Sequence, residues 1–171
     1  MASDNPHRRS GVFMLWLAWL LILGGGWWLA DHWLAQQANP NRAPSVNASG
    51  EVVLTRNREG HYVADGEING KRVTFILDTG ATSVALSTRL AEALQLHRGA
   101  SVQVTTANGV TTGYQTRLKS VRLGAIVVDD VSAVYSENMP DDAVLLGMSF
   151  LKRVEFTQRG EHLILRGLGY E

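Results

Sequence analysis

The chain has 171 residues, which is enough for one modest domain with an appendage. Its 16 basic and 16 acidic residues balance to a net charge of +0, which argues against a nucleic-acid-binding surface, so no nucleic-acid partner is expected. The absence of cysteine excludes disulfides and thiol nucleophiles, and the five scattered histidines lack the i, i+4 spacing of a helical metal site, so we predict no metal ligands.

The first predicted element is an apolar segment without charge, residues 11–30 (GVFMLWLAWLLILGGGWWLA). About 20 residues, each rising 1.5 Å, span a hydrocarbon core of roughly 30 Å. Trp27 and Trp28 lie at its end, where aromatic rings favour the headgroup region. We therefore predict a single transmembrane anchor over residues 11–30, preceded by a short segment over residues 1–10.

The charges that flank this segment predict its orientation. Arg8 and Arg9 precede it, whereas only Arg42 lies close behind it, and this small bias favours a cytoplasmic N-terminus. The expected location is the inner (plasma) membrane, with the domain on the periplasmic or extracytoplasmic side. A cleaved signal peptide is the alternative, because the flank is basic and Ala35 and Ala38 follow, but no clear A-x-A site comes directly after the apolar run.

Residues 31–50 have the composition of a linker, with Pro40, Pro44 and many small polar residues. Residues 51–171 follow as one domain that reads mainly as short strands. Ser87–Leu96 differs, because its leucines have helical spacing and Ser87 could cap the helix.

Apolar and alternating segments predict strands in this domain. They are Val52–Leu54, Tyr62–Ile68, Arg72–Leu77, Val102–Thr106, Val110–Thr116, Val121–Leu123, Ile126–Val128, Val131–Tyr135, Val144–Leu146 and His162–Arg166. Turns are expected at Asn69–Gly70, Asn108–Gly109, Gly124 and Asp129–Asp130.

The sequence Asp78-Thr79-Gly80 follows an apolar strand and carries the strongest chemical signal. A carboxylate at the end of a buried strand is held rigidly, and Gly80 allows a sharp turn. Two such carboxylates brought together share a proton, so that one can activate water while the other polarises a peptide carbonyl. The tripeptide alone is weak support, because an ordinary turn with a hydrogen-bonded Asp has the same residues.

The surrounding sequence resembles the retropepsin-like aspartic proteases, and more closely their bacterial membrane-anchored members. The residues that carry the resemblance are FILDTGATSVALS at 75–87, TANG at 106–109 and LLGMSFL at 145–151, in the expected order. The resemblance covers about Val63 to Arg166. It implies an all-β fold, a retropepsin-like (acid protease) closed barrel with one short helix, preceded here by the single transmembrane helix.

The same resemblance implies roles for individual residues. Asp78 would be the catalytic aspartate, with Thr79 and Gly80 supporting it, and Ala81 and Thr82 would contact an extended substrate. The hairpin at 105–113, with Ala107, Asn108 and Gly109 at its turn, would be a flap that closes over substrate, although an ordinary exposed hairpin has the same turn chemistry. Leu146 and Gly147 would pack beneath the active-site loop. No cofactor is implied.

One Asp-Thr-Gly per chain implies a homodimer, because the reaction uses two aspartates. The predicted function is therefore a membrane-anchored aspartic endopeptidase that hydrolyses peptide or protein substrates as a homodimer. Terminal strands form the interface in this family, which makes 162–166 a candidate there. The alternatives are a catalytically inactive module of the same fold, used for dimerisation or peptide binding, and a tethered β domain without a site.

Overall fold

The computed structural model describes residues 6–106, 109–141 and 143–168, and it divides into two units, Met1–Gln37 and Ala38–Glu171. The described residues of the first unit all belong to α1 (Pro6–Ala38), whose stretch Phe13–Ala38 is long and apolar enough to cross a membrane. The helix continues eight residues beyond the predicted span, so residues 31–38 of the expected linker are helical.

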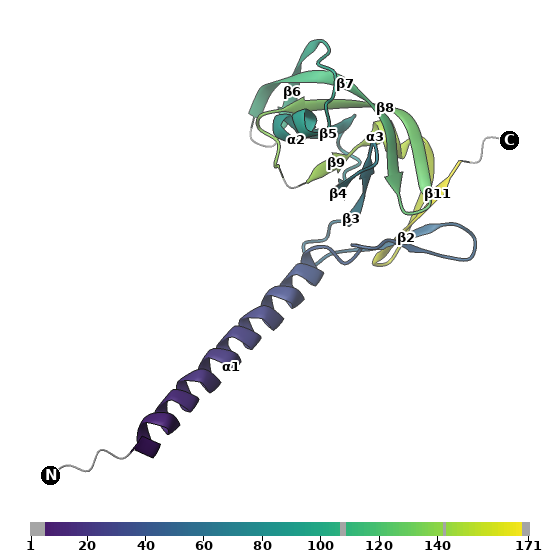
Figure 1. The fold of residues 1–171 in the computed structure, drawn as a ribbon. Coiled ribbons are helices and arrows are strands. Elements are labelled where there is room, and N and C mark those ends of the chain that lie inside the picture. Colours follow the sequence, from purple (N-terminus) through teal and green to yellow (C-terminus); the bar gives the residue numbers. More distant parts are fainter. Residues whose placement is uncertain (1–5, 107–108, 142, 169–171) are drawn as a thin grey trace. The chain divides into compact units, whose positions relative to one another are not determined.

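The second unit is mostly β with two short helices among its described residues (Figure 1). Its larger sheet has seven strands in the order β3-β4-β9-β5-β8-β7-β6. These are β3 (Val63–Ile68), β4 (Lys71–Leu77), β5 (Val84–Ser87), β6 (Ser101–Thr106), β7 (Gly109–Leu123), β8 (Ile126–Ser136) and β9 (Val144–Leu146). β3 lies at one end of this order and β7 lies next to the strand at the other end. These two strands also pair with each other.

The smaller sheet has four strands in the order β1-β2-β11-β10. They are β1 (Ser45–Val46), β2 (Val52–Thr55), β10 (Val154–Arg159) and β11 (His162–Gly167). The two helices are α2 (Thr88–Ala93) and α3 (Met148–Leu151). Ser87 caps α2 as predicted, since its hydroxyl accepts a hydrogen bond from Leu90 N–H at 3.1 Å.

Local turn chemistry explains the hairpin that precedes Asp78. Asn69 and Gly70 have φ of 52° and 79°, so both adopt the left-handed conformation that two-residue hairpin turns need. The register pairs Ile68 with Lys71 on either side of this turn. The predicted Asn-Gly turn therefore sets which β4 residues face the core and where β4 ends.

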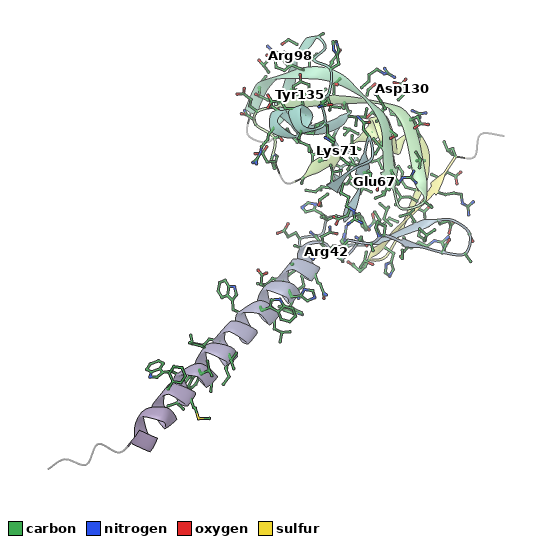
Figure 2. The ribbon with its side chains drawn as sticks, in the orientation of Figure 1. Arg42, Glu67, Lys71, Arg98, Asp130 and Tyr135 are labelled. Carbon is green, nitrogen blue, oxygen red and sulfur yellow. The ribbon has the colours of Figure 1, made fainter. Side chains whose placement is uncertain are left out.

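The core of the second unit is built from large apolar side chains of both sheets. Phe75 and Leu86, on the strands that flank the Asp78 segment, are fully buried, and so are Leu146 and Phe150. Charged side chains lie mainly at the surface of this unit, and Arg42, Glu67, Lys71, Arg98 and Asp130 are labelled in Figure 2. The strands beside Asp78 are thus anchored in a well-packed interior.

Asn41, inside the expected linker, is buried in the second unit with an exposed fraction of 5%. Its amide donates to the carbonyls of Thr55 and Val63 at 2.8 and 2.7 Å, and its side-chain oxygen accepts from Thr55 N–H at 2.7 Å. These bonds tie Asn41 to the end of β2 and the start of β3. The folded unit consequently begins before residue 51.

β7 and β8 are longer than the sequence predicts. Each joins two expected short strands, and β8 runs through Asp129 and Asp130, where the sequence predicts a turn. Asp130 keeps a turn-like φ of 53° within the strand. The predicted turn at Gly124 is found, because β7 and β8 pair up to Leu123 and Ile126 on either side of it.

Candidate active site

Asp78 follows directly after β4, at a point where β4 and β9 end and β5 begins. β9 lies between β4 and β5, running parallel to β4 and antiparallel to β5. The loop from Asp78 to Ser83 therefore crosses from β4 to β5 past the end of β9. This arrangement holds the carboxylate at the end of a strand that is anchored in the core by Val73 and Phe75.

Backbone hydrogen bonds fix the loop to the end of β9. Asp78 N–H donates to Leu146 O at 3.2 Å, and Met148 N–H donates to Ala81 O at 2.8 Å. Within the loop, Gly80 N–H donates to Asp78 Oδ1 at 2.8 Å. One carboxylate oxygen of Asp78 is thus oriented by the backbone of its own loop.

Gly147 lies against the same loop at very close range. A Cβ at this position would be 2.3 Å from Ser83 O and 2.7 Å from Ala81 O. Carbon and oxygen atoms without a bond between them cannot approach so closely, so only glycine fits without a shift of the backbone. The close approach places Leu146 and Gly147 beside the Asp78 loop.

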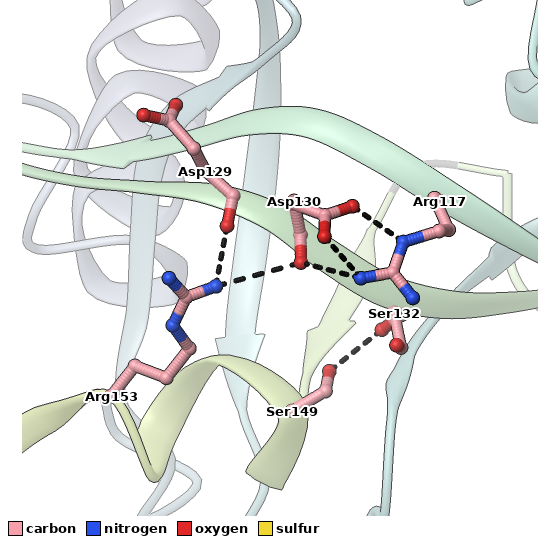
Figure 3. A network of polar contacts seen from close by, with 6 residues as sticks. All are labelled: Arg117, Asp129, Asp130, Ser132, Ser149 and Arg153. Atoms are coloured by element: carbon pink, nitrogen blue, oxygen red, sulfur yellow. Dashed lines mark hydrogen bonds and ion pairs between the residues drawn. The ribbon is translucent and has the colours of Figure 1, made fainter.

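Ser149, on α3, connects the loop region to β8 (Figure 3). Its hydroxyl accepts a hydrogen bond from Val84 N–H at 3.0 Å and donates to Ser132 O at 2.7 Å. Val84 is fully buried and is the first residue of β5 after the loop. One hydroxyl therefore joins α3, β5 and β8 just behind the Asp78 loop.

A charged cluster lies near this connection, on β7, β8 and the chain after α3 (Figure 3). Arg117 forms a bidentate ion pair with the carboxylate of Asp130 and also donates to its carbonyl at 3.3 Å. The hydrogen bond from Arg117 lowers the pKa of Asp130 below its ordinary value. Arg153 donates to the carbonyls of Asp129 and Asp130, which links the end of α3 to β8.

A cleft of about 630 Å³ opens in front of Asp78. The Asp78 loop lines one side of it, and β6, with Val102 and Val104, lines another. Ala85, Val134, Met139 and Leu145 complete the apolar part of its wall. Among the described residues that line this cleft, Asp78 alone carries a charge.

The structure brings most of the predicted site residues together. Gly80, Ala81 and Thr82 line the cleft with Asp78, and Thr79 is an exposed residue of the same loop. In the predicted flap, β6 and β7 form an antiparallel hairpin that pairs Thr106 with Gly109. Ala107 and Asn108 lie outside the described residues.

Several residues of the site are not predicted by the sequence. Met139 lies in a connection between strands, and Val134 and Val102 look like ordinary strand residues, so nothing local marks them as cleft residues. Ser149 carries a weak signal, because it is a lone hydroxyl within the apolar segment 148–151. In the described part of the chain, no three His, Asp or Glu side chains gather in a way that could hold a metal ion.

Comparison with known proteins places this geometry among proteases. The family model described as gag-polyprotein putative aspartyl protease matches residues 64–153, which include the Asp78 loop, the β6–β7 hairpin, β9 and α3. The crystal structure of a retropepsin-like aspartic protease from Rickettsia conorii is similar, with a TM-score of 0.56 and 29% identity. That match covers 69% of this chain and 90% of the other.

Two curated bacterial proteins, both named as uncharacterized, are also similar. A Sinorhizobium protein is 34% identical over 134 residues, which covers 74% of this chain and 58% of the relative. A Rickettsia prowazekii protein is 32% identical over 108 residues, which covers 61% of this chain and 46% of the relative. The chain thus spans about half the length of these curated relatives.

Proposed function

Because this chain belongs to the family of retropepsin-like aspartic proteases, we propose that it is an aspartic endopeptidase with Asp78 as its catalytic carboxylate. The observation that carries the proposal is the position of Asp78, the single charged group among the described residues lining a cleft of about 630 Å³. A carboxylate so placed can act on a peptide that enters the cleft.

The proposed active form is a homodimer in which each chain supplies one Asp78. Acid–base catalysis at a peptide bond needs a base for the attacking water and an acid for the carbonyl oxygen. Among the described lining residues, the cleft of one chain offers only one carboxylate. A twofold axis that passes between two Asp78 side chains would supply both groups from identical surfaces.

In the proposed reaction, the two carboxylates share one proton and hold a water molecule between them. The ionised carboxylate takes a proton from the water while the water oxygen bonds to the peptide carbon. At the same time the protonated carboxyl gives its proton to the carbonyl oxygen. As the C–N bond of the resulting diol breaks, the newly protonated carboxyl gives its proton to the nitrogen, and the other, now ionised, carboxylate takes a proton from one diol hydroxyl. The products are an amine and a carboxylic acid, and the two carboxylates again share one proton. The hydrogen bond from Gly80 keeps each carboxylate in position throughout.

The substrate is proposed to bind in an extended conformation between the active-site loop and the β6–β7 hairpin. Ala81 and Thr82 would contact its backbone from the loop, while Thr79 would support the paired site. The hairpin, with Ala107, Asn108 and Gly109 at its turn, would act as a flap that excludes water. The length and apolar character of α1 support a further proposal, that this helix anchors the enzyme in the inner membrane with the protease domain outside the cytoplasm.

The test is cleavage of a mixed peptide library by the full chain in nanodiscs, beside its Asp78→Asn variant. Asp129→Asn is the matched control, because Asp129 is exposed and lies away from the cleft lining. We expect wild type and Asp129→Asn to cleave equally, and Asp78→Asn to lose roughly 10²–10⁴-fold in rate, as expected for loss of a general acid or base. A dimeric wild-type chain that cleaves no peptide would contradict the proposal and favour a peptide-binding module.

A further inference from the structure

The β unit follows α1 with few residues in between. Leu34 is the last large apolar residue of the helix, which ends at Ala38, and Asn41 is already buried in the β unit. Four helical steps and three extended residues reach about 17 Å at most, and part of that length crosses the headgroup layer. At any angle between the helix and the β unit, the surface around Asn41 therefore stays near the bilayer that α1 is proposed to cross.

A second segment, the loop 56–61, is joined to the same point of the chain. The Asn57 side-chain amide donates to the carbonyl of Ala38, the last residue of α1, at 3.1 Å. The side-chain oxygen of Asn57 accepts from the backbone N–H groups of Glu59 and His61 at 3.0 and 2.8 Å, which fixes the shape of the loop. The side chains of this loop are thus held beside the residues that follow the proposed membrane anchor.

Two unpaired arginines lie on this part of the β unit. Arg42 comes directly after the buried Asn41 and is labelled in Figure 2, and Arg58 lies in the loop. Both are exposed, and neither forms an ion pair or a side-chain hydrogen bond with any described residue. Arg56 instead lies over the ring of Tyr62, 5.7 Å from its centre. The guanidinium groups of Arg42 and Arg58 are therefore available to an external anion.

Acidic side chains are fewer here than basic ones. The turn at 159–161 adjoins the loop, because Arg56 N–H donates to Glu161 O at 2.9 Å. We define the juxtamembrane surface as residues 42, 56–61 and 159–161, where arginines outnumber glutamates four to two, although the whole chain has a net charge of +0. Asp65 lies nearby but is half-buried, and one of its carboxylate oxygens accepts from Asn39 and Thr74. The surface is thus locally basic.

We propose that the juxtamembrane surface binds anionic lipid headgroups of the bilayer that α1 crosses. Phosphate oxygens accept charge-assisted hydrogen bonds from guanidinium groups, and Arg42 and Arg58 are the principal donors. The contact holds the β unit against the bilayer, where the anchor alone would leave it free to turn. The proposal rests on the proposed anchoring by α1 and adds a second, lipid-dependent attachment.

A fluorophore at residue 61 measures this contact in the full chain. The chain has no cysteine of its own, so His61→Cys carries a single uncharged dye. The His61 side chain is exposed, and the hydrogen bonds of this residue use its backbone. The chain is placed in nanodiscs of phosphatidylcholine, or of phosphatidylcholine with anionic phosphatidylglycerol, each with the same fraction of lipid that carries a quencher on its headgroup. Quenching should be stronger in the anionic discs, and the difference should vanish in about 1 M salt, which screens charges beyond roughly 3 Å.

Removal of charge tests the two arginines. Arg42→Gln together with Arg58→Gln should lower the ratio of docked to undocked chains in anionic discs about 25-fold, from about five-fold for each arginine. Lys119→Gln together with Lys152→Gln is the matched control. Both lysines are exposed and lie outside the juxtamembrane surface, and the net charge changes by the same amount. The control should keep the quenching difference of the wild-type chain.

Stronger quenching in anionic discs that is lost in the arginine variant and kept in the lysine variant supports the juxtamembrane surface. Equal quenching in the two kinds of disc, or equal loss in both variants, overturns it. Extraction by alkaline carbonate is measured separately. A chain that is released refutes the anchor and this surface with it, whereas a retained chain with equal quenching refutes the surface alone. None of these measurements requires peptide cleavage, so their outcome is independent of the proposed catalysis.

Discussion

The backbone at Gly147 runs so close to the Asp78 loop that even a methyl group has no space between them. The atoms that a Cβ would meet are the backbone oxygens of Ser83 and Ala81, which cannot rotate away as a flexible side chain could. Met148 N–H, the next donor along the chain, is bonded to the same Ala81 carbonyl. Any movement of the loop away from residue 147 would therefore also weaken this hydrogen bond.

Gly147→Ala should destabilise the protein by about 1–3 kcal/mol, as overpacked sites do. It should also reduce peptide cleavage, because relief of the clash displaces the loop that carries Asp78. Thermal unfolding and cleavage rates measured on the same samples check both effects. Gly167→Ala is the control, since a Cβ at Gly167 meets nothing within 4 Å. Equal stability of the two variants would contradict the prediction.

Part of this site can be predicted because its residues follow one another in the sequence. Asp78, Thr79 and Gly80 are contiguous, so their sequence alone indicates a loop that carries a carboxylate. Gly147 could be recognised only by resemblance, because nothing in its neighbourhood reveals contact with a loop more than 60 residues earlier. Cleft residues such as Met139 depend on how distant strands pack, which sequence periodicity does not specify.

At the scale of elements, the Ser149 side chain links α3 to both β5 and β8 by hydrogen bonds. The Ser149 hydroxyl is the acceptor for the buried Val84 N–H, and its own proton goes to Ser132 O. A buried N–H that loses its acceptor retains the cost of its desolvation. The start of β5, and with it the end of the Asp78 loop, is therefore sensitive to this one hydroxyl.

Ser149→Ala should cost about 1–3 kcal/mol of unfolding free energy, the typical penalty for an unsatisfied buried donor. Ser149→Thr keeps the hydroxyl and should retain more stability and activity than the alanine variant. Ser132→Ala is the control, because the bond from Ser149 uses the backbone carbonyl of Ser132. Chemical denaturation gives the three free energies, and an alanine variant as stable as wild type would refute this role of Ser149.

The elements also show where sequence patterns fail. The Asn69–Gly70 hairpin was predictable because its left-handed residues are encoded locally. β10 was not predicted, since an edge strand exposed on both faces has no regular apolar alternation. The turn expected at Asp129–Asp130 is wrong because Arg117 and Arg153, distant in sequence, hold this segment within β8.

At the scale of the whole molecule, the segment just after α1 belongs to the folded β unit. Asn41 is buried and makes three side-chain hydrogen bonds to residues at the ends of β2 and β3. Composition alone suggested a linker, because Asn, Pro and Ala are common in linkers. The contacts that make Asn41 part of the domain come from residues 14 and 22 positions away.

A chain that starts at residue 38 should therefore be more stable than one that starts at residue 51. The difference should be about 2–4 kcal/mol, from several buried hydrogen bonds at about 1 kcal/mol each. Asn41→Ala in the longer chain should reproduce most of this loss, whereas Asn138→Ala, at an exposed position, should not. Urea denaturation measures the differences, and equal stability of the two truncated chains would show that residues 38–50 contribute nothing.

The insertion of β9 between β4 and β5 also has a consequence for the order of events during synthesis. Residues 78–83 leave the ribosome long before residues 144–146, the strand on which their loop rests. Contacts between residues so far apart in sequence form late in folding. A nascent chain that ends after β8 thus carries Asp78, Thr79 and Gly80 without the strand to which their loop is hydrogen-bonded. The hydrogen bond from Asp78 N–H to Leu146 O can form only after β9 has been synthesised.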